Sequence, residues 1–185
     1  MADIELKSVF IVTGDTGSGK TTFVMRLMEL LRDHSLSIAG FTALSVPHDG
    51  PSGSFNMLDL VSGKILPLAS RRFYEGWEQV GRFYFNPEGI RTGKRILEDA
   101  LKTEHDLFVV DEIGPFELEG KIWAENLTRI LERRAWPVLL VVREPLVAAV
   151  VQKWNLQDAV LIDIRQLNPD QAANLVLPET MGRDD

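Results

Sequence analysis

The architecture of the chain follows from eight residues near its start, Gly14-Asp15-Thr16-Gly17-Ser18-Gly19-Lys20-Thr21, which match the phosphate-binding pattern G-x-x-x-x-G-K-[ST]. An apolar run, Val9 to Val12, precedes this stretch, and a helical pattern with Val24, Leu27, Met28 and Leu31 follows it. The glycines let the backbone turn and approach phosphate closely, because they carry no Cβ. Successive N–H groups then form a nest for an anion at the start of the helix. The sequence therefore predicts a strand, a phosphate loop and a helix in that order.

Three side chains of this loop have expected roles. Lys20 is the point charge for the β and γ phosphates, and the Thr21 hydroxyl is placed to hold Mg²⁺. Asp15 would repel a triphosphate, so we expect its carboxylate to point outward.

Composition limits the class of protein. The 185 residues are enough for one domain with a substantial core. A net charge of -7 and a pI near 5.0 argue against a large nucleic-acid surface. The absence of cysteine excludes a disulfide scaffold, a thiolate zinc site and a cysteine nucleophile. The N-terminal residues do not form a signal peptide pattern, and no apolar run reaches the roughly 18 residues that span a bilayer. We therefore expect a cytoplasmic protein without nucleic-acid or membrane partners.

Helical and strand patterns alternate along the rest of the chain. Predicted helices follow the loop to about 33–35, begin at Asn86-Pro87, cover 122–131 and 146–154, and begin again at Asn168-Pro169. Predicted strands cover 38–46, 55–60, 65–68, 81–85, 107–110, 138–142 and 159–163. This alternation indicates a single α/β domain over 1–177, with a mostly parallel sheet flanked by helices. The polar tail, 178–185, is expected to fray.

The middle of the chain contains an insertion that the phosphate loop does not need. Segment 47–54 is rich in turn formers and predicts a mobile loop, and the region of about 47–80 predicts a β-hairpin extension on the base or substrate side of the site. Within it, Arg71-Arg72-Phe73-Tyr74-Glu75-Gly76-Trp77 combines cations with aromatics. This segment is either a lid or base-stacking element or, the interpretation we favour, a small satellite of the core.

A second chemical element is Leu107-Phe108-Val109-Val110-Asp111-Glu112. The continuous apolar run indicates a strand buried on both faces. Its two acids come at the carboxyl edge, where ligands bind in open α/β sheets. This pattern is typical of a Walker B element, in which Asp111 supports Mg²⁺ and Glu112 polarises an attacking water. Arg143 follows strand 138–142 at the same edge, and it either contacts the γ-phosphate or has a structural role.

Together these motifs resemble the small P-loop nucleoside-triphosphatases, the family that includes the cancer-related nucleoside-triphosphatase and its thermophilic relatives. The resemblance rests on Gly14 to Thr22, Gly40-Phe41-Thr42, Gly81-x-Phe83-x-Phe85-Asn86 and Asp111-Glu112-Ile113-Gly114-x-x-Glu117-Leu118. The chain departs from the family pattern at three places: Phe116 replaces the usual Met, Phe83 replaces a frequent Tyr, and Ser52-Gly53-Ser54-Phe55 replaces Arg-x-Gly-Phe.

The resemblance implies a RecA-like P-loop NTPase sheet and Mg²⁺-dependent hydrolysis of ATP, and also of GTP, CTP and UTP, to NDP and phosphate. It implies nucleotide contacts from Gly14, Asp15, Thr16, Gly17, Ser18, Gly19, Lys20, Thr21, Thr22, Asp111 and Gly114. Metal ligation then falls to Thr21 and Asp111, and Glu112 is the base. The residues themselves make Lys20 and Arg143 further catalytic candidates. Because Arg143 is the only intrinsic arginine finger that the sequence offers, we expect slow turnover.

Two alternatives stay open at this point. The first is a kinase or cofactor-assembly protein that passes phosphate to a small acceptor instead of water. The second is a nucleotide-dependent switch that binds partners and hydrolyses almost nothing. Phosphate release without an acceptor separates the first from a hydrolase, and stoichiometric binding without turnover identifies the second.

Overall fold

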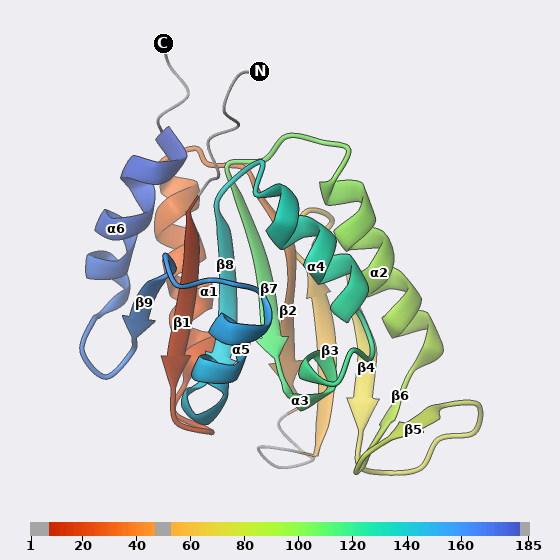
Figure 1. The fold of residues 1–185 in the computed structure, drawn as a ribbon. Helices are drawn as coiled ribbons and strands as arrows, with labels where there is room; N and C mark the ends of the chain where they lie inside the picture. The colour runs from red at the N-terminus through yellow and green to blue at the C-terminus, as the bar shows by residue number, and fades with distance from the viewer. Residues whose placement is uncertain (1–7, 47–52, 182–185) are drawn as a thin grey trace.

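The computed structural model describes residues 8–46 and 53–181, which form one sheet covered by helices on both faces (Figure 1). The strands are β1 (Val9–Gly14), β2 (Ile38–Ser45), β3 (Ser54–Asp59), β4 (Ile65–Ser70), β5 (Glu78–Val80), β6 (Phe83–Phe85), β7 (Leu107–Ile113), β8 (Val138–Arg143) and β9 (Val160–Asp163). The helices are α1 (Lys20–Asp33), α2 (Pro87–Ala100), α3 (Pro115–Leu118), α4 (Ala124–Arg133), α5 (Val147–Lys153) and α6 (Pro169–Met181), with a 3-10 turn, η2 (Glu144–Leu146). None of the helices in these two ranges is both long enough and apolar enough to cross a membrane.

The sheet runs in the order β5-β6-β4-β3-β2-β7-β8-β1-β9. Its pairs β2–β7, β7–β8, β8–β1 and β1–β9 are parallel. The predicted α/β fold with a mostly parallel sheet is therefore confirmed. Because β8 alone separates β1 from β7, the phosphate loop after β1 and the acids at the end of β7 lie at the same edge, one strand apart.

The insertion continues this sheet through antiparallel pairs. β3 pairs with β2, β4 with β3, and β6 with both β4 and β5. Strand β5 was not predicted, and the predicted strand 81–85 begins only at Phe83, because Gly81 lies in a turn with φ 60°. The predicted mobile loop falls mostly on 47–52, outside the described residues.

Helices α1 and α6 pack on one face of the sheet, and α2, α4 and α5 pack on the other (Figure 1). Alternate residues of the buried β7 supply both cores: Leu107 and Val109 face α1, whereas Phe108 and Val110 face the opposite layer. Asn86 caps α2 as predicted, accepting a hydrogen bond from the Glu88 N–H at 3.1 Å.

The predicted boundary at residue 178 differs from the structure, in which α6 continues through Pro178 to Met181. Thr180 is buried, and its hydroxyl donates to the Leu177 carbonyl at 2.9 Å. Glu179 accepts a hydrogen bond of 2.6 Å from Ser8. These contacts, together with packing of α6 on α1, outweigh the one backbone hydrogen bond that a proline removes.

The segment 71–77 is also unlike the favoured prediction, because Phe73 and Tyr74 are exposed and Trp77 is only half-buried. The side chains of Phe73 and Tyr74 are 70% and 44% exposed. Tyr74 stacks on Trp77 with ring centroids 4.5 Å apart, and Phe73 meets Tyr84 edge-on at 5.5 Å. The segment precedes the short edge hairpin β5–β6, which is too small to bury these rings.

Candidate active site

The phosphate loop joins β1 directly to α1. Gly17 and Gly19 have φ values of 75° and 91°, which glycine adopts without steric cost. Helix α1 begins at Lys20, so the unpaired N–H groups of its first turn belong to the loop region. The strand, loop and helix therefore follow one another as the sequence predicts, and the helix start provides a place for an anion.

Lys20 is buried beneath the loop. Its ammonium donates to the carbonyl oxygens of Gly14 at 3.1 Å and Asp15 at 2.6 Å. Burial lowers the pKa of Lys20, whereas the Glu112 and Asp111 carboxylates oppose that shift. The loop lysine and the acids of β7 therefore interact electrostatically.

Asp111 is a buried carboxylate held by two hydroxyls. Its Oδ2 accepts hydrogen bonds from Thr42 at 2.5 Å and from Thr21 at 3.3 Å. Burial raises the pKa of Asp111 to about 7, and the bonds from Thr42, the Ala43 backbone and Thr21 oppose that rise. Sequence reasoning assigned no role to Thr42. Its signal is a hydroxyl within β2, the strand beside β7, directly after the last register pair of these strands, Phe41 with Val110.

The two acids at the end of β7 lie on opposite sides of the sheet, because successive residues of a strand alternate. Asp111 pairs with Val141 and Ile113 with Val142, so Glu112 bulges out between them. Whereas Asp111 meets Thr21 on the α1 side, Glu112 lines a pocket on the opposite side of the sheet edge.

Arg143 links the loop to Glu112. It ends β8, where its register partner on β1 is Gly14, and its Nε donates to Glu112 Oε1 in a half-buried ion pair. The arginine that the sequence placed at this edge therefore lies beside the predicted base. Its partner in the present arrangement is that carboxylate.

Gly114 and Glu117 form a second buried contact next to Glu112. The Gly114 N–H donates to Glu117 Oε2 at 2.9 Å, at the start of α3. Glu117 is only 4% exposed, and burial raises its pKa to about 7. The Gly114 N–H is thus already engaged within the protein, and Glu117 is a buried acid for which sequence reasoning predicted no function.

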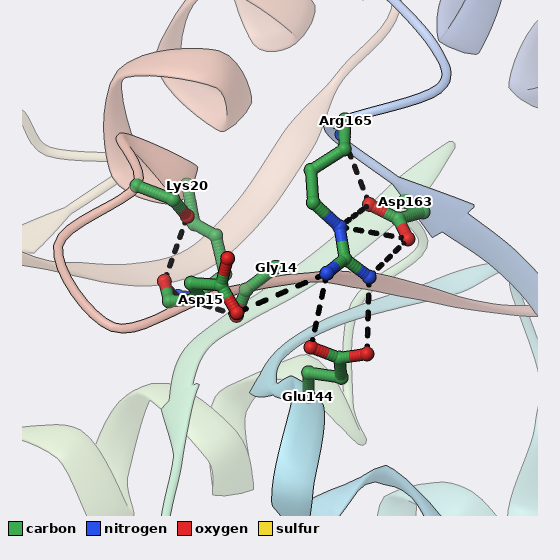
Figure 2. Close-up of polar contacts among 7 residues, drawn as sticks. Gly14, Asp15, Lys20, Glu144, Asp163 and Arg165 are labelled. Atoms are coloured by element: carbon green, nitrogen blue, oxygen red, sulfur yellow. Dashed lines mark hydrogen bonds and ion pairs between the residues drawn. The ribbon is translucent and has the colours of Figure 1, made fainter.

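Arg165 ties the phosphate loop to two other strand ends (Figure 2). Its guanidinium lies 2.6 Å from Asp163, 3.0 Å from Glu144 and 3.8 Å from Asp15. Arg165 holds the pKa of Asp163 down at about 2. The Asp15 side chain is 65% exposed, which agrees with the expected outward direction. No sequence motif pointed to Arg165, because its partners come from the phosphate loop, the start of η2 and the end of β9.

The donors at the end of β7 suit magnesium. Thr21 Oγ1 and Asp111 Oδ2 are oxygen atoms 3.3 Å apart, and Mg²⁺ prefers hard oxygen ligands. Within residues 8–46 and 53–181, no group of three or more His, Asp or Glu side chains could hold a metal ion. One or two protein oxygens, completed by phosphate and water, are the usual set for Mg²⁺ with a nucleotide. The residues present therefore fit such a site.

Comparison with known proteins gives concordant matches. A family model described as NTPase matches residues 9–177. The chain is similar to nucleoside-triphosphatase THEP1 of Archaeoglobus fulgidus, with 34% identity over 122 residues, covering 66% of this chain and 70% of the relative. It is also similar to THEP1 of Methanosarcina barkeri, with 31% identity over 161 residues, covering 86% and 89%.

Two solved structures share the fold. The crystal structure of THEP1 from Aquifex aeolicus has a TM-score of 0.66 and 24% identity, covering 92% of this chain and 95% of that one. The solution structure of a human cancer-related nucleoside triphosphatase has a TM-score of 0.72 and 21% identity, covering 96% and 100%. At these identities the likeness concerns the fold alone.

Proposed function

Since the chain belongs to the NTPase family, we propose that it hydrolyses ATP and other nucleoside triphosphates to the diphosphate and phosphate, with Mg²⁺, by attack of water on the γ-phosphorus. One observation carries this proposal. The hydroxyl of Thr21 in the phosphate loop lies 3.3 Å from the carboxylate of Asp111, ninety residues later. An anion cradle and a buried acid thus meet at one point, as Mg-nucleotide chemistry requires.

Binding depends first on the loop. The N–H groups at the start of α1 cradle the phosphates, and the Lys20 ammonium exchanges the carbonyls of Gly14 and Asp15 for β and γ phosphate oxygens. Thr21 and Asp111 would hold the metal, with Thr42 fixing the direction of the Asp111 carboxylate. When bound, Mg²⁺ neutralises charge on the triphosphate oxygens. These fixed charges lower the barrier because they act where negative charge develops.

Glu112 is the proposed base, and Arg143 controls its availability. In this structure the guanidinium is paired with Glu112. An arriving γ-phosphate offers Arg143 a competing anion, which frees the carboxylate to take the proton of the attacking water. Arg143 then stabilises charge on the γ oxygens from within the same chain. Because it must first leave a tight ion pair, we expect slow turnover.

The test is Glu112→Gln. This variant should bind Mg-ATP as the wild type does and release phosphate about 10²- to 10⁴-fold more slowly, since the amide cannot accept the proton. Phosphate release is measured with ATP, GTP, CTP and UTP, each with and without Mg²⁺. Glu119→Gln is a matched control, because Glu119 is exposed and pairs with the exposed Lys121.

The outcomes separate the open alternatives. Wild-type phosphate release by Glu112→Gln removes that residue from the mechanism. Stoichiometric binding without turnover in the wild type favours the switch over the hydrolase. Equal release without Mg²⁺ contradicts the metal site at Thr21 and Asp111.

A further inference from the structure

A pocket beside Glu112 is not needed for the hydrolysis of a nucleotide by water. Its volume is about 90 Å³, and its walls come from the antiparallel strands β3, β4 and β6 and from α3. The apolar lining includes Phe55, Leu68, Ala69, Phe83, Phe85 and Phe116. Glu112, Glu117 and Arg143 form its polar part. The insertion in the sheet therefore builds a second compartment next to the predicted base.

The walls suit one small aromatic ring. Phe55 meets Phe83 edge-on at 5.9 Å, and Phe85 meets Phe116 edge-on at 5.7 Å. An entering ring can join such edge-to-face contacts, which stabilise aromatic pairs beyond simple burial. A volume of about 90 Å³ lies below the roughly 300–1,000 Å³ of sites for drug-sized ligands, so the occupant is a small molecule.

The polar part selects a hydrogen-bond donor. Glu112, which pairs with Arg143, is a carboxylate that accepts hydrogen bonds and does not donate them, so it disfavours an anion and favours a hydroxyl. The buried Glu117 already accepts a hydrogen bond from the Gly114 N–H. Among the described residues that line the pocket, Arg143 is the one cation, and it is already paired with Glu112. A neutral ring that carries a hydroxyl matches both the apolar walls and this acidic part.

Glu112 also connects the pocket to the phosphates. It lines the pocket, and its charge acts on Lys20 across the loop. A hydroxyl bound at Glu112 is therefore near the position expected for the γ-phosphate, and it has lost much of the freedom that a water molecule keeps.

We propose that this pocket binds a small primary alcohol with a single aromatic ring, and that the alcohol can replace water as the acceptor of the γ-phosphoryl group. The alcohol oxygen forms a bond to the γ-phosphorus, while the bond from that phosphorus to the β–γ bridging oxygen breaks. The nucleoside diphosphate leaves with the electron pair, and Glu112 takes the hydroxyl proton. The products are a phosphate monoester and the diphosphate. This inference rests on the proposed function, because both reactions use the same loop and base.

The probe is benzyl alcohol, which joins one ring to one primary hydroxyl. Protein, Mg-ATP and benzyl alcohol are incubated, and ³¹P NMR separates benzyl phosphate from inorganic phosphate. We expect both products. Ethanol at the same concentration has the hydroxyl without the ring, and it should give at least about tenfold less ester. Binding of benzyl alcohol without nucleotide is measured separately by ligand-observed NMR.

Two alanine substitutions form a matched pair. Ala69→Leu adds bulk to the β4 wall of the pocket, and it should lower the ratio of ester to phosphate at least about tenfold and abolish benzyl alcohol binding. Ala148→Leu makes the same change on the exposed surface of α5 and should keep the wild-type ratio. If Ala69→Leu does not fold, Phe116→Ala replaces it, because this partly exposed wall residue can be removed with less strain and should weaken benzyl alcohol binding.

The outcomes distinguish the inference from the hydrolase itself. Phosphate without benzyl phosphate overturns the inference and leaves hydrolysis standing. Release of neither product overturns both. Equal ester from ethanol, or benzyl alcohol binding that survives in Ala69→Leu and Phe116→Ala, places the acceptor outside this pocket and also overturns the inference.

Discussion

Replacing Glu117 by Gln should make the stability of the protein less dependent on pH. Glu117 is 4% exposed and accepts a hydrogen bond of 2.9 Å from the Gly114 N–H. Burial is the main cause that raises its pKa to about 7, and the Gly114 bond opposes the rise. A buried carboxylate thus costs the folded protein free energy whenever it is ionised.

The sign follows from proton binding. Between the ordinary pKa of 4.5 and about 7, the folded protein keeps the Glu117 proton that the unfolded chain has lost. Stability from this group is therefore complete below pH 4.5 and is lost as the pH rises through 7. At roughly 1.4 kcal/mol per pKa unit, the full loss is about 3 kcal/mol. Glutamine can keep the acceptor for Gly114 and does not titrate, so the variant lacks this loss.

Urea unfolding at pH 5, 6, 7 and 8, followed by tryptophan fluorescence, gives the free energy of unfolding of both proteins. Relative to the wild type, Glu117→Gln should gain about 2–3 kcal/mol between pH 5 and pH 8. Any cost of burying the amide is the same at every pH, so it does not enter this difference. Glu119→Gln, at an exposed site, should show no such gain. A constant difference between Glu117→Gln and the wild type across the range refutes the reasoning.

Three further substitutions test the loop, the metal site and the sheet. Lys20→Ala should weaken ATP binding at least about tenfold by calorimetry, since it removes the buried ammonium of the loop, and unchanged affinity contradicts the loop assignment. Thr42→Val removes the 2.5 Å hydrogen bond to Asp111 and should raise the Mg²⁺ concentration for half-maximal phosphate release by about 10- to 100-fold. If that Mg²⁺ concentration does not change, Thr42 does not orient the Asp111 carboxylate. Gly40→Ala places a Cβ 1.9 Å from the Val109 carbonyl oxygen, so it should lower the free energy of unfolding, measured in urea, by more than about 3 kcal/mol. An unfolding curve equal to that of the wild type disproves this close approach of β2 and β7.

The phosphate loop and strands β1 and β7 can be predicted from the sequence because the patterns that indicate them are local. Each of these patterns depends on residues a few positions apart. They are the glycines with positive φ at 17 and 19, the apolar run that leads to Asp111 and Glu112, and the Asn86 cap. The parallel alternation then places the ends of β1, β7 and β8 at one edge, which brings Arg143 into the candidate site.

Tertiary structure alone decides which side chains meet. Thr42 and Asp111 are 69 residues apart, and Arg165 meets Asp15 and Glu144 from distant parts of the chain, so these contacts depend on strand order and register. The exposure of Phe73 likewise depends on whether a neighbouring element covers the sheet edge. The composition of the segment does not indicate whether such a cover exists. Short-range patterns constrain backbone conformation, whereas the β7 bulge at Glu112 and the packing that keeps α6 helical to Met181 arise only when distant segments pack together.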